Sequence, residues 1–216
     1  MSEDGFASII LDVDSTLCGV EGIDWLAAAR GADVSERVEE LTRRAMAGEV
    51  ALDSVYGERL ALVAPSWESV AALADVYVAA LAPGAAETVR EIMASGRSVV
   101  LVSGGILEAI RPVAVQLGIP QRHVHAVSLR FDTKGNYRGY ETTSPLATST
   151  GKRVVAETLH LRRRVLAVGD GVTDLAMRPA VDSFAAYTGF IRRASVADVA
   201  DVEIEDYRQL GELVLT

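Results

Sequence analysis

Two aspartates separated by a single residue follow an apolar run near the N-terminus. Residues 9–11 have the composition of a buried strand, and Asp12 and Asp14 come directly after it. Side chains at positions i and i+2 of an extended backbone point the same way, so both carboxylates can face one substrate. One can then attack as a nucleophile while the other transfers protons, a pairing that suits phosphoryl transfer through an aspartyl-phosphate.

Three further polar segments occur where the sequence predicts the end of a strand or the start of a helix. They are Ser103-Gly104 after one apolar run, Lys152 at a predicted helix start, and 169-GDGVTD-174 after another apolar run. In a parallel α/β sheet, ligands bind beyond the carboxyl ends of the strands. We therefore expect all four segments to meet at one edge of the sheet.

The four segments together supply carboxylates, a hydroxyl, a lysine and glycine turns. Clustered carboxylates bind Mg²⁺, which prefers oxygen ligands, and the other groups complement phosphoryl oxygens. Each segment alone has an ordinary explanation: the paired aspartates can form a capped turn, and Lys152 can be a surface lysine. Their combination and order favour a Mg²⁺-dependent phosphoryl-transfer site.

Short apolar runs alternate with helical patterns along most of the chain. This alternation predicts an α/β fold, a Rossmann-like parallel sheet flanked by helices. The predicted strands are 7–11, 98–102, 165–168 and 183–187, and the predicted helices are about 84–95, 105–117 and 151–161.

Two regions depart from the alternation. Residues 23–81 have helical spacing almost throughout, which is too long for one crossover helix and predicts an inserted small helical cap. Residues 127–142 contain two alternating runs separated by Lys134-Gly135-Asn136, which predicts a β-hairpin. We expect a core domain and a cap domain with the bounds 1–17 plus 82–216 and 18–81.

Composition restricts the class of protein. The 216 residues are 50% hydrophobic with a formal net charge of -9, which argues against nucleic-acid partners and acidic membranes. The single cysteine, Cys18, excludes an internal disulfide and is typical of a reducing cytosol. Neither a signal peptide nor a membrane-spanning segment is evident. We therefore expect a cytoplasmic protein, with its oligomeric state left open.

In this order, the four segments resemble those of the haloacid dehalogenase (HAD) superfamily of aspartate-nucleophile phosphohydrolases. The stretch DVDSTLCGVEGIDWLA is most similar to the first motif of the phosphoserine phosphatase family. The resemblance implies that Asp12 is the nucleophile and a Mg²⁺ ligand. It implies that Asp14 is the general acid and base and offers its backbone carbonyl to the metal. Asp170 would be a direct metal ligand, and Asp174 a direct or water-mediated one.

The same resemblance assigns residues to the phosphoryl group. Ser103 and Gly104 would hold its oxygens, and Lys152 would neutralise charge between it and the nucleophile. Thr173 occupies a position that contacts the phosphate side of the site in the family.

Substrate recognition is implied by residues in and beside the predicted cap. Glu21 matches the family's acceptor for an amino group, Arg59 its carboxylate-binding arginine, and Met46 an apolar lining position. Without the resemblance, Glu21 could be a helix-start acid and Arg59 a surface ion-pair partner. Ala51 and Leu52 depart from the proline and aromatic residue that many members carry, which could loosen the wall over the substrate's carbon chain.

The implied substrate is a small phosphorylated amino acid. The first hypothesis is Mg²⁺-dependent hydrolysis of L-phosphoserine to L-serine, the last step of serine biosynthesis. Transfer of the phosphoryl group to another alcohol, and hydrolysis of a broader set of phosphomonoesters, are alternatives. A phospho-accepting signalling receiver uses similar groups, but receivers are shorter and lack the helical insertion.

Overall fold

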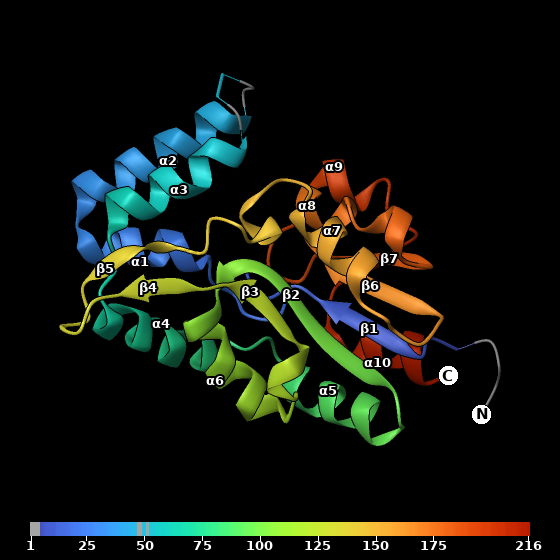
Figure 1. Ribbon diagram of the computed structural model, residues 1–216. Helices are drawn as coiled ribbons and strands as arrows, with labels where there is room; N and C mark the ends of the chain where they lie inside the picture. Colours follow the sequence, from blue (N-terminus) through green and yellow to red (C-terminus); the bar gives the residue numbers. More distant parts are fainter. Residues whose placement is uncertain (1–4, 47–48, 51) are drawn as a thin grey trace.

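A six-stranded parallel sheet forms the centre of the molecule. The computed structural model describes residues 5–46, 49–50 and 52–216 (Figure 1). From one edge to the other, the strands are β3 (Val124–Val127), β2 (Ser98–Ile106), β1 (Ser8–Leu11), β6 (Val165–Gly169), β7 (Ser183–Tyr187) and β8 (Val202–Ile204). This arrangement confirms the predicted α/β fold.

Helices cover both faces of the sheet (Figure 1). One face carries α5 (Ala85–Ala94), α6 (Leu107–Leu117) and α10 (Tyr207–Leu215); the other carries α7 (Gly151–Thr158), α8 (Val172–Leu175) and α9 (Ala194–Ala197). Short 3-10 helices complete the connections: η1 (Gln121–His123), η2 (Pro145–Ala147) and η3 (Arg178–Ala180).

Strand β1 lies between β2 and β6, and its side chains alternate between the two faces. Ile9 and Leu11 pack into the core beneath α5, α6 and α10, whereas Ile10 packs into the core beneath α7 and α9. Burying each such side chain stabilises the fold by about 1.5–3 kcal/mol. The Asp12 N–H still donates to the Val168 carbonyl at 3.0 Å, so the first aspartate stands where the sheet ends.

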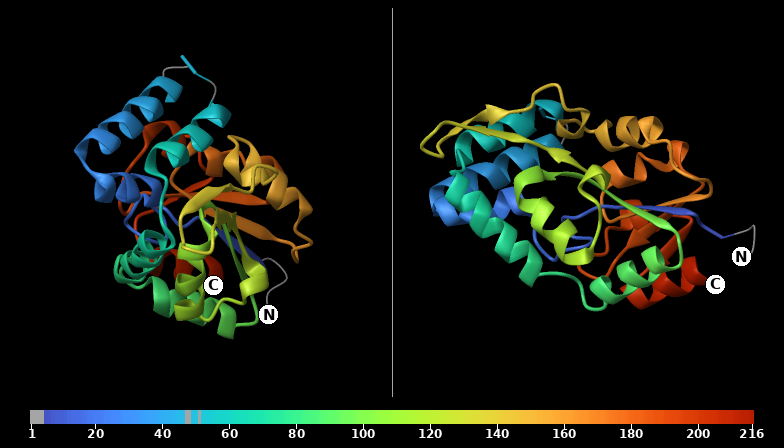
Figure 2. Two further views of the ribbon diagram at one scale, coloured as in Figure 1. Left: turned by 60° about the vertical axis from the view of Figure 1, so that its left-hand side comes forward. Right: turned by 60° about the horizontal axis from the view of Figure 1, so that its bottom comes forward.

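Four helices connect β1 to β2: α1 (Gly22–Arg30), α2 (Ala32–Met46), α3 (Leu52–Val63) and α4 (Trp67–Ala79). The α2–α3 pair leans over one end of the sheet in all three views (Figures 1 and 2). By contrast, α4 packs alongside α6, with Val70, Leu73 and Tyr77 buried.

The predicted hairpin is present as β4 (Leu129–Phe131) and β5 (Tyr137–Tyr140), an antiparallel pair. Its aromatic side chains pack on the helices between β1 and β2. The Tyr140 ring lies 5.4 Å from that of Tyr56 on α3, and the Phe131 ring lies 5.5 Å from that of Trp67 on α4. The hairpin therefore lies at the same end of the molecule as α2 and α3 (Figure 2).

Element bounds differ from the sequence prediction at a few places. Strand β2 continues to Ile106, so α6 begins two residues later than expected, because the backbone of Gly104 and Gly105 remains extended. The short edge strands β3 and β8 were not predicted. Within the described ranges, no helix combines the length and the apolar character needed to cross a membrane.

Candidate active site

A pocket of about 470 Å³ opens at the carboxyl ends of β1, β2 and β6. Helices α1, α2, α3, α7, α8 and α9 and the short helix η2 also contribute to its walls. The structure brings together most of the residues singled out from the sequence, and the lining includes Asp12, Asp14, Glu21, Arg59, Gly104, Lys152, Asp170, Thr173 and Asp174. Ser103 is buried directly beside this lining.

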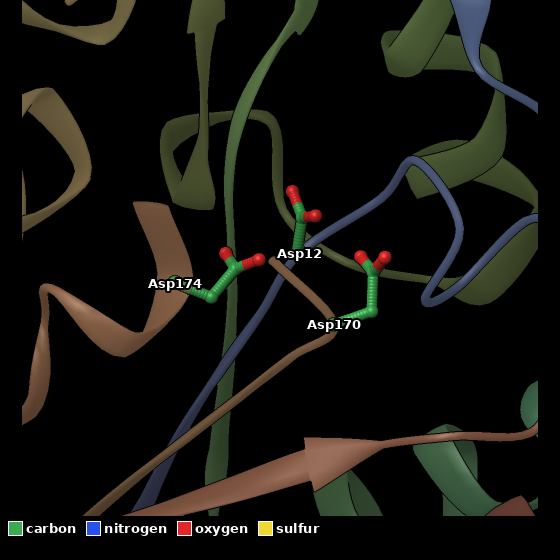
Figure 3. A group of neighbouring side chains, drawn as sticks. All are labelled: Asp12, Asp170 and Asp174. Atoms are coloured by element: carbon green, nitrogen blue, oxygen red, sulfur yellow. The ribbon is translucent and has the colours of Figure 1, made fainter. Parts of the chain in front are cut away.

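Three buried carboxylates lie around one point of the pocket (Figure 3). Asp12 follows β1, Asp170 follows β6 and Asp174 belongs to α8, and one oxygen of each lies within 4.8 Å of the others. Gly169 permits this approach, because a Cβ there would lie 2.2 Å from the Asp174 carboxyl carbon. Two segments distant in the sequence, one around Asp12 and one around residues 170–174, thus converge at the edge of the sheet.

Burial sets the electrostatics of this cluster. Loss of hydration raises the pKa of Asp12 well above its ordinary value; the Asp174 carboxylate raises it further and Lys152 opposes the rise. Burial also raises the pKa of Asp170, and the charge of Asp174 acts in the same direction. A cation placed among these oxygens would offset both effects.

Lys152 is buried at the start of α7, beside the carboxylate cluster. Its Nζ lies 2.6 Å from Asp12 Oδ1 and 2.7 Å from Asp174 Oδ1. Burial alone would lower the pKa of Lys152, but the two carboxylates outweigh it and the pKa is raised. Gly151 allows α7 to begin here, because a Cβ would lie 1.7 Å from the Pro145 carbonyl oxygen.

Hydrogen bonds from three residues hold the carboxylate of Asp14 in place. Its Oδ1 accepts hydrogen bonds from the Gly22 N–H at 2.8 Å and the Tyr77 hydroxyl at 2.5 Å. Its Oδ2 lies 3.4 Å from the donating Ser103 hydroxyl. Burial raises the pKa of Asp14, and the hydrogen bond from Tyr77 is the largest effect opposing the rise. The carboxyl is therefore fixed beside the pocket.

The backbone at the end of β2 packs closely against the Asp14 carboxylate. The Gly105 N–H donates to Ser103 Oγ at 3.0 Å, and the Tyr56 hydroxyl donates to the Gly104 carbonyl at 2.9 Å. A Cβ at position 105 would lie 2.6 Å from Asp14 Oδ2. Glycine at this position leaves room for the carboxylate.

Glu21 lies at the N-terminus of α1 and lines the pocket. Ser15 adopts a left-handed backbone conformation (φ 52°) immediately after Asp14, and its hydroxyl donates to Glu21 Oε1 at 2.7 Å. Burial and, secondarily, the Asp14 carboxylate raise the pKa of Glu21 to about 7.

Arg59 reaches the same pocket from α3. One guanidinium nitrogen donates to Asp24 at 2.5 Å. Its Nε is buried and has no hydrogen-bond partner among the residues that the structure describes. A buried donor without a partner costs free energy, so this nitrogen is suited to bind an anionic group of a ligand.

Comparison with known proteins identifies the family. The family model for haloacid dehalogenase-like hydrolases matches residues 6–182. The chain belongs to this family. Human phosphoserine phosphatase is 38% identical over 211 residues, which cover 95% of this chain and 92% of the human protein.

Solved structures resemble the whole of this HAD-like hydrolase. A phosphoserine phosphohydrolase-like protein from Francisella tularensis is 25% identical with a TM-score of 0.85, covering 97% of this chain and 100% of its own. A phospho-aspartyl intermediate analogue of phosphoserine phosphatase is 26% identical with a TM-score of 0.77. The match covers 98% of this chain and 100% of that one. The superfamily and fold expected from the sequence are therefore confirmed.

The carboxylate cluster of this HAD-like hydrolase fits a hard divalent cation. Asp12, Asp170 and Asp174 offer only oxygen donors, they are buried, and their mutual repulsion is relieved by positive charge. Lys152 and Arg193 supply part of that positive charge, because Lys152 pairs with Asp12 and Arg193 pairs with Asp170.

The sequence prediction missed several groups that the structure places at the site. Arg193 donates to Asp170 Oδ2 at 2.8 Å and lies 3.7 Å from Glu21. It follows β7 after a short loop, so the strand-end rule could have found it. The contacts of Tyr77 and Asp24 were also missed, because helical spacing does not reveal which polar group a side chain meets.

One predicted residue has no described position for its side chain. Met46 ends α2, and its side chain lies outside the described part of the structure. The same holds for Ala51 and for the side chain of Leu52, so the predicted loosening of the cap wall stays a prediction.

Proposed function

We propose that the protein is a Mg²⁺-dependent phosphatase that hydrolyses L-phosphoserine to L-serine and phosphate. The observation that carries this proposal is one pocket joining a carboxylate–lysine cluster to an acidic Glu21 and a basic Arg59. Phosphoserine has a phosphate, an ammonium and a carboxylate, so it presents a complementary group to each part. The names of the curated relatives support the same substrate.

The reaction proceeds in two steps. A carboxylate oxygen of Asp12 attacks phosphorus, the bond from phosphorus to the serine oxygen breaks, and Asp14 gives its proton to that oxygen. Water then attacks the aspartyl-phosphate, Asp14 takes a proton from the water, and phosphate leaves with Asp12 restored. The i and i+2 spacing on extended backbone lets both carboxylates reach one substrate.

The remaining groups hold charge in place. Asp12, Asp170, Asp174 and the Asp14 carbonyl would hold Mg²⁺, which when bound neutralises the phosphoryl oxygens and the carboxylate cluster. Lys152 adds positive charge at the nucleophile. Ser103, Gly104 and Thr173 contact the transferred phosphoryl group.

Recognition of the amino acid uses the opposite side of the pocket. Glu21 accepts the ammonium group, and Arg59 binds the carboxylate through its planar guanidinium. Met46 contributes an apolar contact to the carbon chain. The predicted cap of residues 18–81 covers a core of residues 1–17 and 82–216. Movement of α2 and α3 would admit substrate, whereas α4 stays packed on α6.

We propose a cellular setting for this reaction as well. The protein acts in the cytoplasm on a small metabolite, in the last step of serine biosynthesis, without nucleic-acid or membrane partners. The acidic net charge of -9 supports the absence of a polyanionic partner.

A phosphate-release screen tests the proposal. Purified protein with Mg²⁺ is assayed on L-phosphoserine and a panel of small phosphomonoesters, and phosphoserine is expected to give the largest kcat/KM. Addition of homoserine or another alcohol, with analysis for a new phosphomonoester, separates hydrolysis from phosphoryl transfer. A stable phosphoprotein without turnover would support a signalling receiver instead, and a flat substrate profile would contradict the specific substrate.

A further inference from the structure

Tyr77 touches the second aspartate from inside the protein. Its side chain is 0% exposed, and its hydroxyl lies 2.5 Å from Asp14 Oδ1. Tyr77 belongs to α4, which packs alongside α6 rather than with the α2–α3 pair (Figure 1). The contact therefore reaches Asp14 from the packed interior and leaves the pocket side of the carboxyl open.

Two donors converge on the same oxygen of Asp14. The Gly22 N–H and the Tyr77 hydroxyl both donate to Oδ1, whereas Oδ2 lies on the side of Ser103 and Gly105. An oxygen that accepts two hydrogen bonds cannot carry a proton without losing one of them. The proton that Asp14 delivers must then reside on Oδ2.

We infer that Tyr77 is a positioning residue that orients Asp14 so that Oδ2 faces the leaving oxygen of the substrate. The inference rests on the proposed function, because it concerns the proton that Asp14 gives to that oxygen. Tyr77 itself does not touch the reacting atoms. Misplacement of a catalytic group by about 1 Å can slow the reaction about 100-fold.

A purely structural explanation competes with this role. A buried tyrosine hydroxyl needs a hydrogen-bond partner, and Asp14 could serve only as that partner. The two explanations differ in one observable. Loss of a positioning contact slows reactions that need protonation of the leaving group, whereas loss of a packing contact affects all substrates alike.

The experiment compares two substrates that carry the same ammonium and carboxylate groups but differ in the leaving atom. O-phospho-L-serine releases an alcohol that needs the proton, whereas S-phospho-L-cysteine releases a thiol with a pKa of about 8.5, which can leave as thiolate. In Tyr77→Phe, kcat/KM should fall about 10–100-fold for phosphoserine and less than about threefold for phosphocysteine. The ratio kcat/KM reports the first step only, so the later use of Asp14 as a base does not enter.

Tyr207→Phe is the matched control. Tyr207 is also buried, and its hydroxyl donates to the Thr16 carbonyl at 3.2 Å rather than to Asp14. This variant loses the same atom from a comparable environment. The ratio of the two kcat/KM values should stay at the wild-type value, whatever happens to thermal stability.

Gly22→Ala disturbs the contact from the other side. A Cβ at position 22 would lie 2.1 Å from the Tyr77 hydroxyl, so the hydroxyl must move while its chemistry is retained. This variant should show the same selective loss on phosphoserine, even if Tyr77→Phe fails to fold. An equal loss on both substrates, or none, in the folded variants overturns the inference. A wild-type protein inactive on phosphoserine contradicts the proposed function instead.

Discussion

Lys152 Nζ lies between two carboxylates, 2.6 Å from Asp12 Oδ1 and 2.7 Å from Asp174 Oδ1. The three side chains come from the start of α7, the end of β1 and α8. The lysine therefore ties together three segments that are distant in the sequence. Removing the lysine leaves the charge of these two buried carboxylates without compensation.

Lys152→Met is expected to reduce both stability and activity. The free energy of unfolding should fall by roughly 3 kcal/mol in metal-free buffer, and Mg²⁺ should restore part of it. Turnover of phosphoserine should fall at least ~100-fold, which steady-state assays will measure. Arg153→Met, the adjacent control, loses only an exposed pair with Glu157 and should change stability by less than ~0.5 kcal/mol. If Lys152→Met had the free energy of unfolding and the turnover rate of the wild type, the role assigned to Lys152 would be contradicted.

Asp12→Asn should abolish covalent labelling and hydrolysis together, a loss of roughly 10⁴-fold or more, because an amide cannot act as the nucleophile. The same change relieves repulsion within the carboxylate cluster, so the variant should unfold at the wild-type temperature or above. Acid-quenched labelling with radioactive phosphoserine and thermal melts measure the two effects. The exposed Asp75→Asn serves as control. A labelled Asp12→Asn protein would exclude Asp12 as the attacked residue.

Removal of divalent cations should stop turnover, because the buried carboxylates of Asp12, Asp170 and Asp174 then lack their main compensating charge. Activity in EDTA should return when Mg²⁺ is added in excess. Mg²⁺ should also raise the melting temperature of the wild type, and should do so much less in Asp170→Asn. Turnover at the wild-type rate in the presence of EDTA would contradict the metal-dependent mechanism.

Arg59→Ala should lower kcat/KM for phosphoserine about 10–100-fold through loss of charged hydrogen bonds to the substrate carboxylate. Phosphoethanolamine has the phosphate and the amino group but no carboxylate, so its low kcat/KM should hardly change. Arg59→Lys should recover only part of the loss, because an ammonium cannot pair both carboxylate oxygens. Unchanged phosphoserine turnover in Arg59→Ala would remove the main basis for the substrate assignment.

Glu21 should give the reaction a pH dependence near neutrality. Burial raises the pKa of Glu21 to about 7, so below pH 7 the free protein holds this side chain neutral and loses its attraction for ammonium. The kcat/KM for phosphoserine should fall as the pH drops through 7. In Glu21→Gln, kcat/KM for phosphoserine should be about tenfold lower at pH 8, and its fall as the pH drops through 7 should be absent. Phosphoglycolate, which has no amino group, corrects for titration of the phosphate; identical profiles for both substrates would refute the assignment.

Hydrophobic runs and strand ends made most of the core predictable. The strands that were predicted are continuous apolar runs, whereas the missed β3 and β8 are short and carry polar residues such as His125 and Glu203. The strand-end rule also explains why the residues around Asp12 and Asp170 could be expected at one edge. Edge strands need no apolar run on both faces, so their signal is weaker.

Side-chain direction was the part that the sequence could not supply. The helical spacing of residues 23–81 predicted helices there, which the structure bears out, but spacing says nothing about the partner of the Tyr77 hydroxyl. The packing of α4 on α6 joins elements separated by an entire helix and strand, so no local pattern encodes it. The roles of the individual site residues remain predictions that the variants above address.

The central place of β1 in the sheet has a consequence for local unfolding. Its backbone is bonded to β2 on one side and β6 on the other, while β3 and β8 each have one neighbour. Amide hydrogens of residues 9–12 should therefore exchange with solvent only when the whole domain opens, and those of the two edge strands much sooner. Fraying at either edge can then proceed without displacing the nucleophile, so heat inactivation through the core should coincide with global denaturation.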